Sequence, residues 1–219
     1  MNKKCPNCKL VNFSKAETCA RCEADLIEVS SEIQQNETPL IRKILKRAAV
    51  CFAVCLFTIS GFYFSLLVTA KRLNFDEKTK VKDAIKVLEE KGFESEVFLM
   101  NYLTAFRAND HWLNASVEKE GAYAATNFPV EIMTVYPDFF QYPLDDTERA
   151  AILLHEAQHL KGADEPEAYE FVWKNRQKLG WTKDKYANSI VWRNVRKQTR
   201  EAAPHLFVCE LKEFADCTE

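Results

Sequence analysis

The feature that most constrains this chain is an uninterrupted apolar block, residues 48–70, which contains no charged side chain. At about 1.5 Å of rise per residue, a helix of this length extends over roughly 34 Å, enough to cross the ~30 Å hydrocarbon core of a bilayer. A signal peptide is a poor fit, because the block is too long and too far from the N-terminus. A buried core helix is the other interpretation, but core helices are seldom apolar all round. The block therefore predicts one transmembrane helix.

Four of the eight cysteines precede this block, as two Cys-x-x-Cys pairs in the stretch CPNCKLVNFSKAETCARC. Each pair can present two thiolates to one metal ion, and two pairs complete a closed, four-sulfur, structural zinc shell formed by Cys5, Cys8, Cys19 and Cys22. Two disulfides or a redox pair are the alternatives. So short a segment cannot bury a core, so metal binding would supply most of its folding free energy. The segment resembles the small N-terminal zinc ribbons of many bacterial membrane proteins, and we assign residues 1–26 to such a ribbon.

The orientation of the predicted helix is not decided by charge, because basic residues flank it on both sides. A thiolate zinc site suits a reducing cytoplasm, whereas the spacing of Cys209 and Cys217 suits a disulfide in an oxidising compartment. We therefore expect the ribbon and a polar linker, residues 27–47, on the cytoplasmic side. The C-terminal domain is expected on the extracytoplasmic side.

Residues 73–219 form the predicted working domain, of α+β class. Asp76 is expected to cap a first helix that ends at Gly92. One or two strands are expected in AYAATNFPVEIMTVYP. Three further helices are expected: one from a capping box of Asp145 and Glu148 to Gly162, one over 165–179, and one from Thr182 to about Ala203. The formal net charge of −2 argues against nucleic acid as a partner.

The helix that ends at Gly162 carries the string HEAQH. Positions four apart share one face of a helix, so His155 and His159 can bind one zinc ion. Glu156 then lies beside that ion, where it can act as the general base for a zinc-activated water. The alternative to a metal site is that the two histidines lie on a surface helix and bind nothing. Leu153, Leu154 and Leu160 indicate instead a partly buried helix, in which unpaired imidazoles would be costly.

No other histidine is near enough in sequence to be the third ligand. Gly162 can take a left-handed conformation and reverse the chain, so that Asp164, Glu165 or Glu167 could return to the same metal ion. An exposed charge at a helix start is the alternative role for such acids.

Two resemblances single out Glu165. HEAQHLKGADE resembles the metzincin string, with Glu165 where that family has His or sometimes Asp; no methionine follows residue 133, so the Met-turn of that family is absent. EPEAYEF resembles the second helix of gluzincin peptidases, in which a ligand Glu precedes a small Ala by three, although those enzymes usually place the Glu further on. The resemblances imply a zincin-like fold: an active-site helix, a ligand helix and a small sheet whose edge strand could hold substrate. Asp164 then reads as a helix cap, with Glu167 as its partner.

These observations predict a single-pass membrane zinc metallopeptidase with one catalytic and one structural Zn²⁺, acting on a peptide or protein. Two alternatives stay open: a non-enzymatic membrane adaptor with a structural metal site, and a zinc amidase acting on cell-wall peptides. An oxyanion donor is also required. The sequence does not choose among its candidates, which are Tyr169, His111, His205 and Tyr186.

Overall fold

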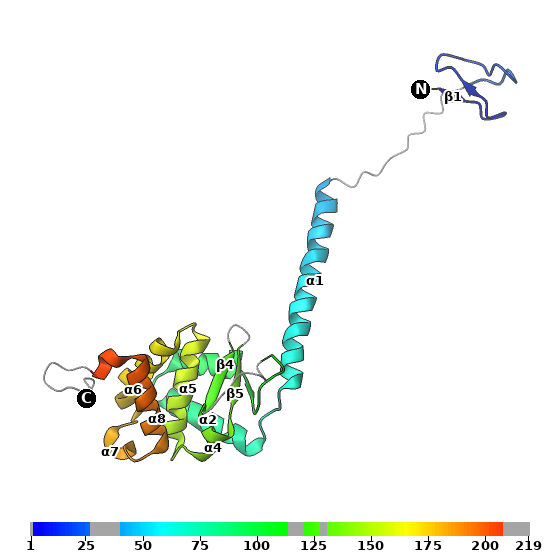
Figure 1. Ribbon diagram of the computed structural model, residues 1–219. Helices are drawn as coiled ribbons and strands as arrows, with labels where there is room; N and C mark the ends of the chain where they lie inside the picture. The colour runs from blue at the N-terminus through cyan, green and yellow to red at the C-terminus, as the bar shows by residue number, and fades with distance from the viewer. Residues whose placement is uncertain (1, 27–39, 114–120, 128–130, 208–219) are drawn as a thin grey trace. The chain divides into compact units, whose positions relative to one another are not determined.

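A computed structural model describes residues 2–26, 40–113, 121–127 and 131–207. These residues fall into two compact units, residues 1–53 and 54–219, and each is described by itself. The predicted disulfide between Cys209 and Cys217 lies outside the described residues. Helices and strands both occur, so the predicted mixed α+β class is confirmed (Figure 1).

The N-terminal unit begins with a two-stranded antiparallel sheet, β1 (Lys3–Lys4) and β2 (Val11–Asn12), paired Lys3 to Asn12 and Lys4 to Val11. An isolated bridge joins Thr18 to Asp25. Cys5, Cys19 and Leu26 form its small buried cluster. This core is far too small to stabilise a fold, which agrees with a unit that depends on metal.

Helix α1 (Leu40–Thr69) contains the apolar block. It is long and apolar enough to cross a membrane, by length and composition, and only a small part of its most apolar stretch is buried. The helix starts earlier than the apolar block, so its first turns carry the basic residues that precede the block.

The second unit is mainly helical around a three-stranded sheet. Its first half contains α2 (Phe75–Glu90), α3 (Glu94–Phe98), the π-helical turn η1 (Leu99–Leu103), β3 (Ala105–Arg107), β4 (Ala124–Asn127), β5 (Ile132–Val135) and α4 (Pro137–Gln141). Its second half contains α5 (Asp146–Leu160), α6 (Glu165–Leu179), α7 (Lys183–Tyr186), α8 (Ile190–Ala202) and the 3-10 turn η2 (Pro204–Phe207). The strand order is β3-β5-β4, with β3 parallel and β4 antiparallel to the fully buried β5.

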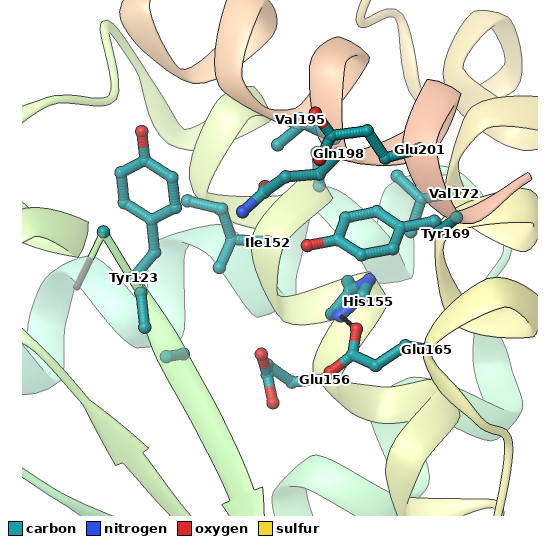
Figure 2. A pocket seen from close by; sticks show the side chains of 15 residues that line it. Tyr123, Ile152, His155, Glu156, Glu165, Tyr169, Val172, Val195, Gln198 and Glu201 are labelled. Carbon is teal, nitrogen blue, oxygen red and sulfur yellow. Dashed lines mark ion pairs between the residues drawn. The ribbon is translucent and has the colours of Figure 1, made fainter. Parts of the chain in front are cut away.

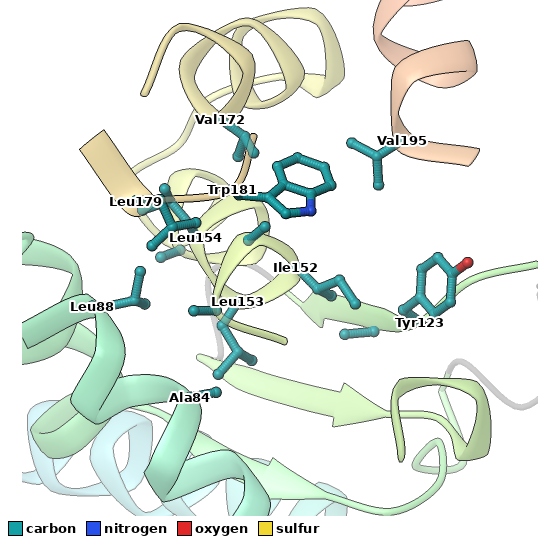
Figure 3. Packing of buried hydrophobic residues seen from close by; sticks show 14 of the residues in the cluster. Ala84, Leu88, Tyr123, Ile152, Leu153, Leu154, Val172, Leu179, Trp181 and Val195 are labelled. Carbon is teal, nitrogen blue, oxygen red and sulfur yellow. The ribbon is translucent and has the colours of Figure 1, made fainter. Parts of the chain in front are cut away.

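Helix α5 lies at the centre of this domain and contacts α2, α6 and β4. It buries apolar residues on opposite sides because it has neighbours on both. Figure 3 shows Leu153 directed toward Ala84 of α2, whereas Trp181 packs on the other side near Val172 of α6 and Val195 of α8. A helix held on several sides is a rigid support for side chains at its surface.

Local capping signals account for most helix ends, with two corrections. The cap of α2 is Asn74, not Asp76: the Asn74 side chain accepts from the Glu77 N–H, and the Glu77 carboxylate accepts from the Asn74 N–H, each at 2.8 Å. Asp145 does cap α5, but Glu148 does not complete a box with it. The Glu148 carboxylate accepts instead from the Leu144 N–H at 2.9 Å.

The helix predicted from Thr182 to about Ala203 is two helices, α7 and α8. Ser189 starts α8 by accepting from the N–H groups of Val191 and Trp192, at 3.1 and 3.3 Å. Its hydroxyl in turn donates to the buried Glu148 carboxylate at 2.5 Å. The break is therefore stabilised by a carboxylate on another helix, which local periodicity does not reveal.

Candidate metal centre

Helix α5 presents both imidazoles of HEAQH on one face, as the spacing predicts. The Nε2 atoms of His155 and His159 are 3.2 Å apart. Their side chains are only 13% and 17% exposed, so the two nitrogens face each other at the edge of the core. Two such nitrogens can share at most one proton, so the arrangement favours a cation between them.

Glu165 reaches these nitrogens from the first residue of α6. Gly162 has a φ of +85°, a left-handed conformation that reverses the chain directly after α5. Oε2 of Glu165 then lies 3.3 Å from Nε2 of His155, and Oε1 lies 3.5 Å from Nε2 of His159. The structure thus brings together the three residues that the sequence analysis selected.

The two other acids of this segment are used in the helix cap. Asp164 accepts from the Glu167 N–H at 2.9 Å, and Glu167 accepts from the Asp164 N–H at 3.2 Å, a complete capping box. Both carboxylates are therefore bonded to backbone N–H groups at the start of α6. Glu165 is the member of the three acids that lies beside them.

The separations between these ligand atoms fit a tetrahedral zinc ion. Ligand atoms at about 2.0–2.1 Å from tetrahedral zinc lie about 3.3–3.4 Å from one another. The three separations here are 3.2, 3.3 and 3.5 Å. The candidate ligand atoms of these residues all lie within 4.8 Å of one another.

A hydrogen bond also orients His159 for metal binding. Its Nδ1 lies 2.9 Å from the carbonyl oxygen of Ala163, which places the ring proton on Nδ1 and leaves the Nε2 lone pair facing His155 and Glu165. Without a cation, the hydrogen bond with Glu165 raises the pKa of His159 to about 9. Hydrogen bonds from His155 and His159 lower the pKa of the Glu165 carboxyl. A proton and a metal ion therefore compete for the same nitrogens.

Glu156 lies between this cluster and strand β4 (Figure 2). It is 6% exposed, and its Oε2 accepts a hydrogen bond from the Thr126 hydroxyl at 2.8 Å. Burial raises the pKa of the Glu156 carboxyl above its ordinary value. Thr126 was missed by the sequence analysis, because nothing in an isolated strand residue shows that it will face a glutamate 30 positions later.

A cavity of about 510 Å³ is lined by two of the three candidate ligands, His155 and Glu165, and by Glu156. Its walls come from α5, α6, α8 and the segment that leads into β4, and they are apolar at Ala124, Ile152, Val172 and Val195. Gln198 and Glu201 line it from α8, as Figure 2 shows. These α8 residues were not predicted, because nothing in the sequence shows that α8 packs on α6.

Of the four residues considered as oxyanion donors, Tyr169 lines this cavity. Its ring centroid is 4.3 Å from that of His155, and its hydroxyl points into the open space (Figure 2). Tyr186 donates to Asp145 at 2.7 Å, and His205 pairs with Glu170 at 3.2 Å. His111 is buried and does not line the cavity. Burial raises the pKa of Tyr169, so the phenol keeps its proton.

The four N-terminal cysteines form a second cluster compatible with a zinc ribbon. The two pairs adopt the same turn: the Lys9 N–H donates to the Cys5 carbonyl and the Glu23 N–H to the Cys19 carbonyl, with positive φ at Lys9 and Glu23. The Sγ–Sγ distances are 3.6 Å for Cys5–Cys22 and 3.4 Å for Cys8–Cys19. Sulfurs bound to tetrahedral zinc at ~2.3 Å would lie about 3.8 Å apart, so the cluster could hold such an ion.

The pKa values of two of these thiols also favour a bound cation. The backbone N–H of Arg21 lowers the pKa of Cys19 to about 6. At Cys22 the N–H of Ala24 favours the thiolate, but the sulfurs of Cys8 and Cys5 outweigh it and raise the pKa to about 12. The fourth thiolate therefore forms readily only when a positive ion offsets the other sulfurs.

Comparisons with known proteins do not assign this chain to a family. No family model matches it, and no curated protein or solved structure matches it. The interpretation of both clusters therefore depends on the chemistry and geometry of the residues themselves.

Proposed function

We propose that residues 73–219 are a zinc-dependent peptidase domain, anchored in a membrane by α1. One observation carries this proposal: the ligand atoms of His155, His159 and Glu165 converge to within 4.8 Å, and His155, Glu165 and the buried Glu156 line one cavity. A purely structural metal site would have no need of an adjoining cavity and an acid held at its wall.

The residues of the site have distinct roles in this reaction. Zinc held by the three ligands would supply a Lewis acid and would lower the pKa of a bound water to about 7. Glu156, held by Thr126, accepts the proton of the attacking water and returns it to the leaving amine. Its raised pKa moves it closer to the working pH of such a base. Tyr169 donates its phenolic proton in a hydrogen bond to the developing oxyanion.

The sheet supports a peptide as the substrate. β4 is one of the two edge strands of this sheet, and Ala124 at its start lines the cavity. An extended peptide can add to such an edge through its main chain and place one side chain in the apolar cavity. For this reason we favour a peptide bond, rather than another acyl bond, as the bond that is cleaved.

The ribbon is proposed to bind a structural zinc ion through its four cysteines, on the cytoplasmic side of the membrane. Its thiolate cluster supports a reducing compartment, and the placement of the peptidase domain on the opposite side follows if α1 crosses once.

The test combines metal content with activity in the full chain purified in detergent. Wild type should bind about two zinc ions per chain, and Glu165→Gln about one. Asp164→Asn is the matched control: asparagine also caps helices well, so this variant loses the charge next to Glu165 but should keep both ions.

Glu156→Gln separates a peptidase from an adaptor. It should keep both zinc ions and lose activity on a quenched fluorescent peptide library. Zinc retained with equal activity in Glu156→Gln would refute the proposed base, and no hydrolysis by wild type would favour the adaptor. Cleavage of muropeptides with none of linear peptides would favour the cell-wall amidase.

A further inference from the structure

The loop after β3 packs onto the last turns of α1. The Trp112 indole N–H donates to the Ser65 hydroxyl at 3.2 Å, and the Trp112 ring makes an edge contact with Phe62, with centroids 6.0 Å apart. The Arg107 guanidinium donates to the carbonyl of Leu67 at 3.4 Å. Leu66, in the same turns of α1, is completely buried. The end of α1 is therefore part of the working domain's fold rather than a free stalk.

The same junction leaves large apolar side chains exposed. Trp112 is 52% exposed, whereas Trp173, Trp181 and Trp192 are at most 3% exposed. Beside it in sequence or on α1, the exposed apolar residues are Leu113 at 50%, Phe64 at 66% and Val68 at 65%. We call Phe64, Val68, Trp112 and Leu113 the junction patch, because they lie at the level of the same turns of α1, although not on one face of that helix.

The level of this patch along α1 follows from the positions of the charges. The apolar stretch is bounded by Arg47 and Lys71, and about 20 residues suffice to cross the hydrocarbon core. The turns that contact Trp112 are the last ones before Lys71, so they lie at the boundary between acyl chains and headgroups if α1 crosses the bilayer. Lys71 and Arg72 are exposed just beyond them, where cations meet anionic headgroups.

We infer that the junction patch is a lipid-contacting surface that lies in the bilayer interface and holds the working domain against the membrane. Tryptophan prefers this level, because its ring is apolar while its N–H keeps a polar partner, here Ser65. A long water-exposed spacer between helix and domain would allow free rotation. The contacts at Ser65 and Leu67 instead tie the domain to the helix end. The candidate metal centre would then act on chains that come close to the membrane surface.

Trp112 gives a direct test, because the other three tryptophans are buried. Full-length protein is reconstituted into vesicles of phosphatidylcholine and phosphatidylglycerol, and the emission of Trp112→Phe is subtracted from that of wild type. The difference should lose at least about half its intensity with lipids brominated near the headgroup end of their chains, and less with lipids brominated near the methyl end. Iodide in the water should quench it weakly.

The matched control is a tryptophan on another exposed part of the same domain. Ile190→Trp in the Trp112→Phe background places it at a 43% exposed position at the start of α8. It should be quenched by iodide and not by brominated lipid. Phenylalanine keeps the ring contact with Phe62, and unchanged near-ultraviolet circular dichroism checks that the fold is retained.

Two outcomes would overturn the inference. Quenching of Trp112 by iodide but not by brominated lipid would show that the patch faces water. Quenching by neither would show that protein covers it, such as a second copy of the chain. The test requires neither zinc nor peptide hydrolysis, so a failed peptidase assay would not affect it.

Discussion

Removing the charge of Glu96 should weaken both the fold and the candidate metal centre. This glutamate is 3% exposed, and its Oε1 accepts hydrogen bonds from Lys161 at 2.7 Å and from Gln158 at 3.3 Å. Lys161 follows the last residue of α5 and lies between His159 and the Gly162 turn. The contact therefore ties α3 to the turn that places Glu165.

The magnitude follows from the exposure of the two partners. A hydrogen bond to a charged group contributes about 1.5–3 kcal/mol to stability. The Lys161 side chain is 38% exposed, so water replaces part of what it loses. We expect Glu96→Gln to lower the free energy of unfolding by about 2 kcal/mol. Zinc binding should weaken by at most about tenfold, because loss of a partner bonded directly to a ligand costs about tenfold or more and Glu96 acts only through Lys161.

The effect should depend on pH in one direction. Burial alone would raise the pKa of Glu96, but the hydrogen bonds from Lys161 and Ser95 outweigh it and lower the pKa below its ordinary value of 4.5. A carboxyl whose pKa is lower in the folded state stabilises the fold above its unfolded pKa, and this stability is lost as the pH falls through the folded value. The difference between wild type and Glu96→Gln should be constant near neutral pH and shrink below about pH 4.5.

Urea unfolding in detergent measures this difference, since the buried tryptophans report on the domain core. Glu94→Gln is the matched control, because it removes an exposed acid from the same short helix and should change stability by less than about 0.5 kcal/mol. Equal stability of the two variants, or a difference that does not shrink in acid, would refute the reasoning. Zinc affinity, measured against a chromophoric chelator, tests the connection to the metal centre.

Three further perturbations test other parts of the structure. Gly162→Ala should cost about 1–2 kcal/mol and weaken zinc binding at the α5 site, because its φ of +85° is left-handed; Gly162→Asn should cost less, and chelator competition compares them. Glu148→Ala should cost about 3 kcal/mol in urea unfolding, because it leaves the indole N–H of Trp181 and the hydroxyl of Ser189 without their buried acceptor; equal stability would contradict this. Cys19→Ser should remove about one zinc ion per chain and make residues 2–26 sensitive to protease, while the tryptophan emission of the second unit stays unchanged.

The parts of the fold predicted correctly depend on signals within a few residues of each helix end. Asp145 caps α5, Asp164 caps α6, and Gly180 closes α6 with a φ of +81°. Each of these residues acts through its own backbone conformation or through an N–H group two or three positions away. Their effect can therefore be read without knowing the tertiary structure.

The parts that sequence did not predict depend on distant partners. Ser189 begins a new helix while bonded to Glu148, which is 41 positions away. Strand β3 is short and pairs in parallel with β5, so neither its length nor its neighbours in sequence indicate it. The cavity wall at Gln198 exists because α8 packs on α6. In each case the stabilising contact joins segments that only the complete fold brings together.

The prediction of Glu165 as the third ligand depends partly on local signals and partly on the fold. Local capping rules leave only one of the three candidate acids available as a ligand. An N-cap and its partner at the third helical position both need their carboxylates for backbone N–H groups, which occupies Asp164 and Glu167. Glu165, the first residue of α6, has a carboxylate that the helix cap does not need. After the left-handed Gly162 it lies close to the preceding helix, α5. A ligand at this position therefore needs only the five residues that lie between it and His159. A ligand placed further along the second helix would instead need that helix to pack alongside the first at a closely defined distance.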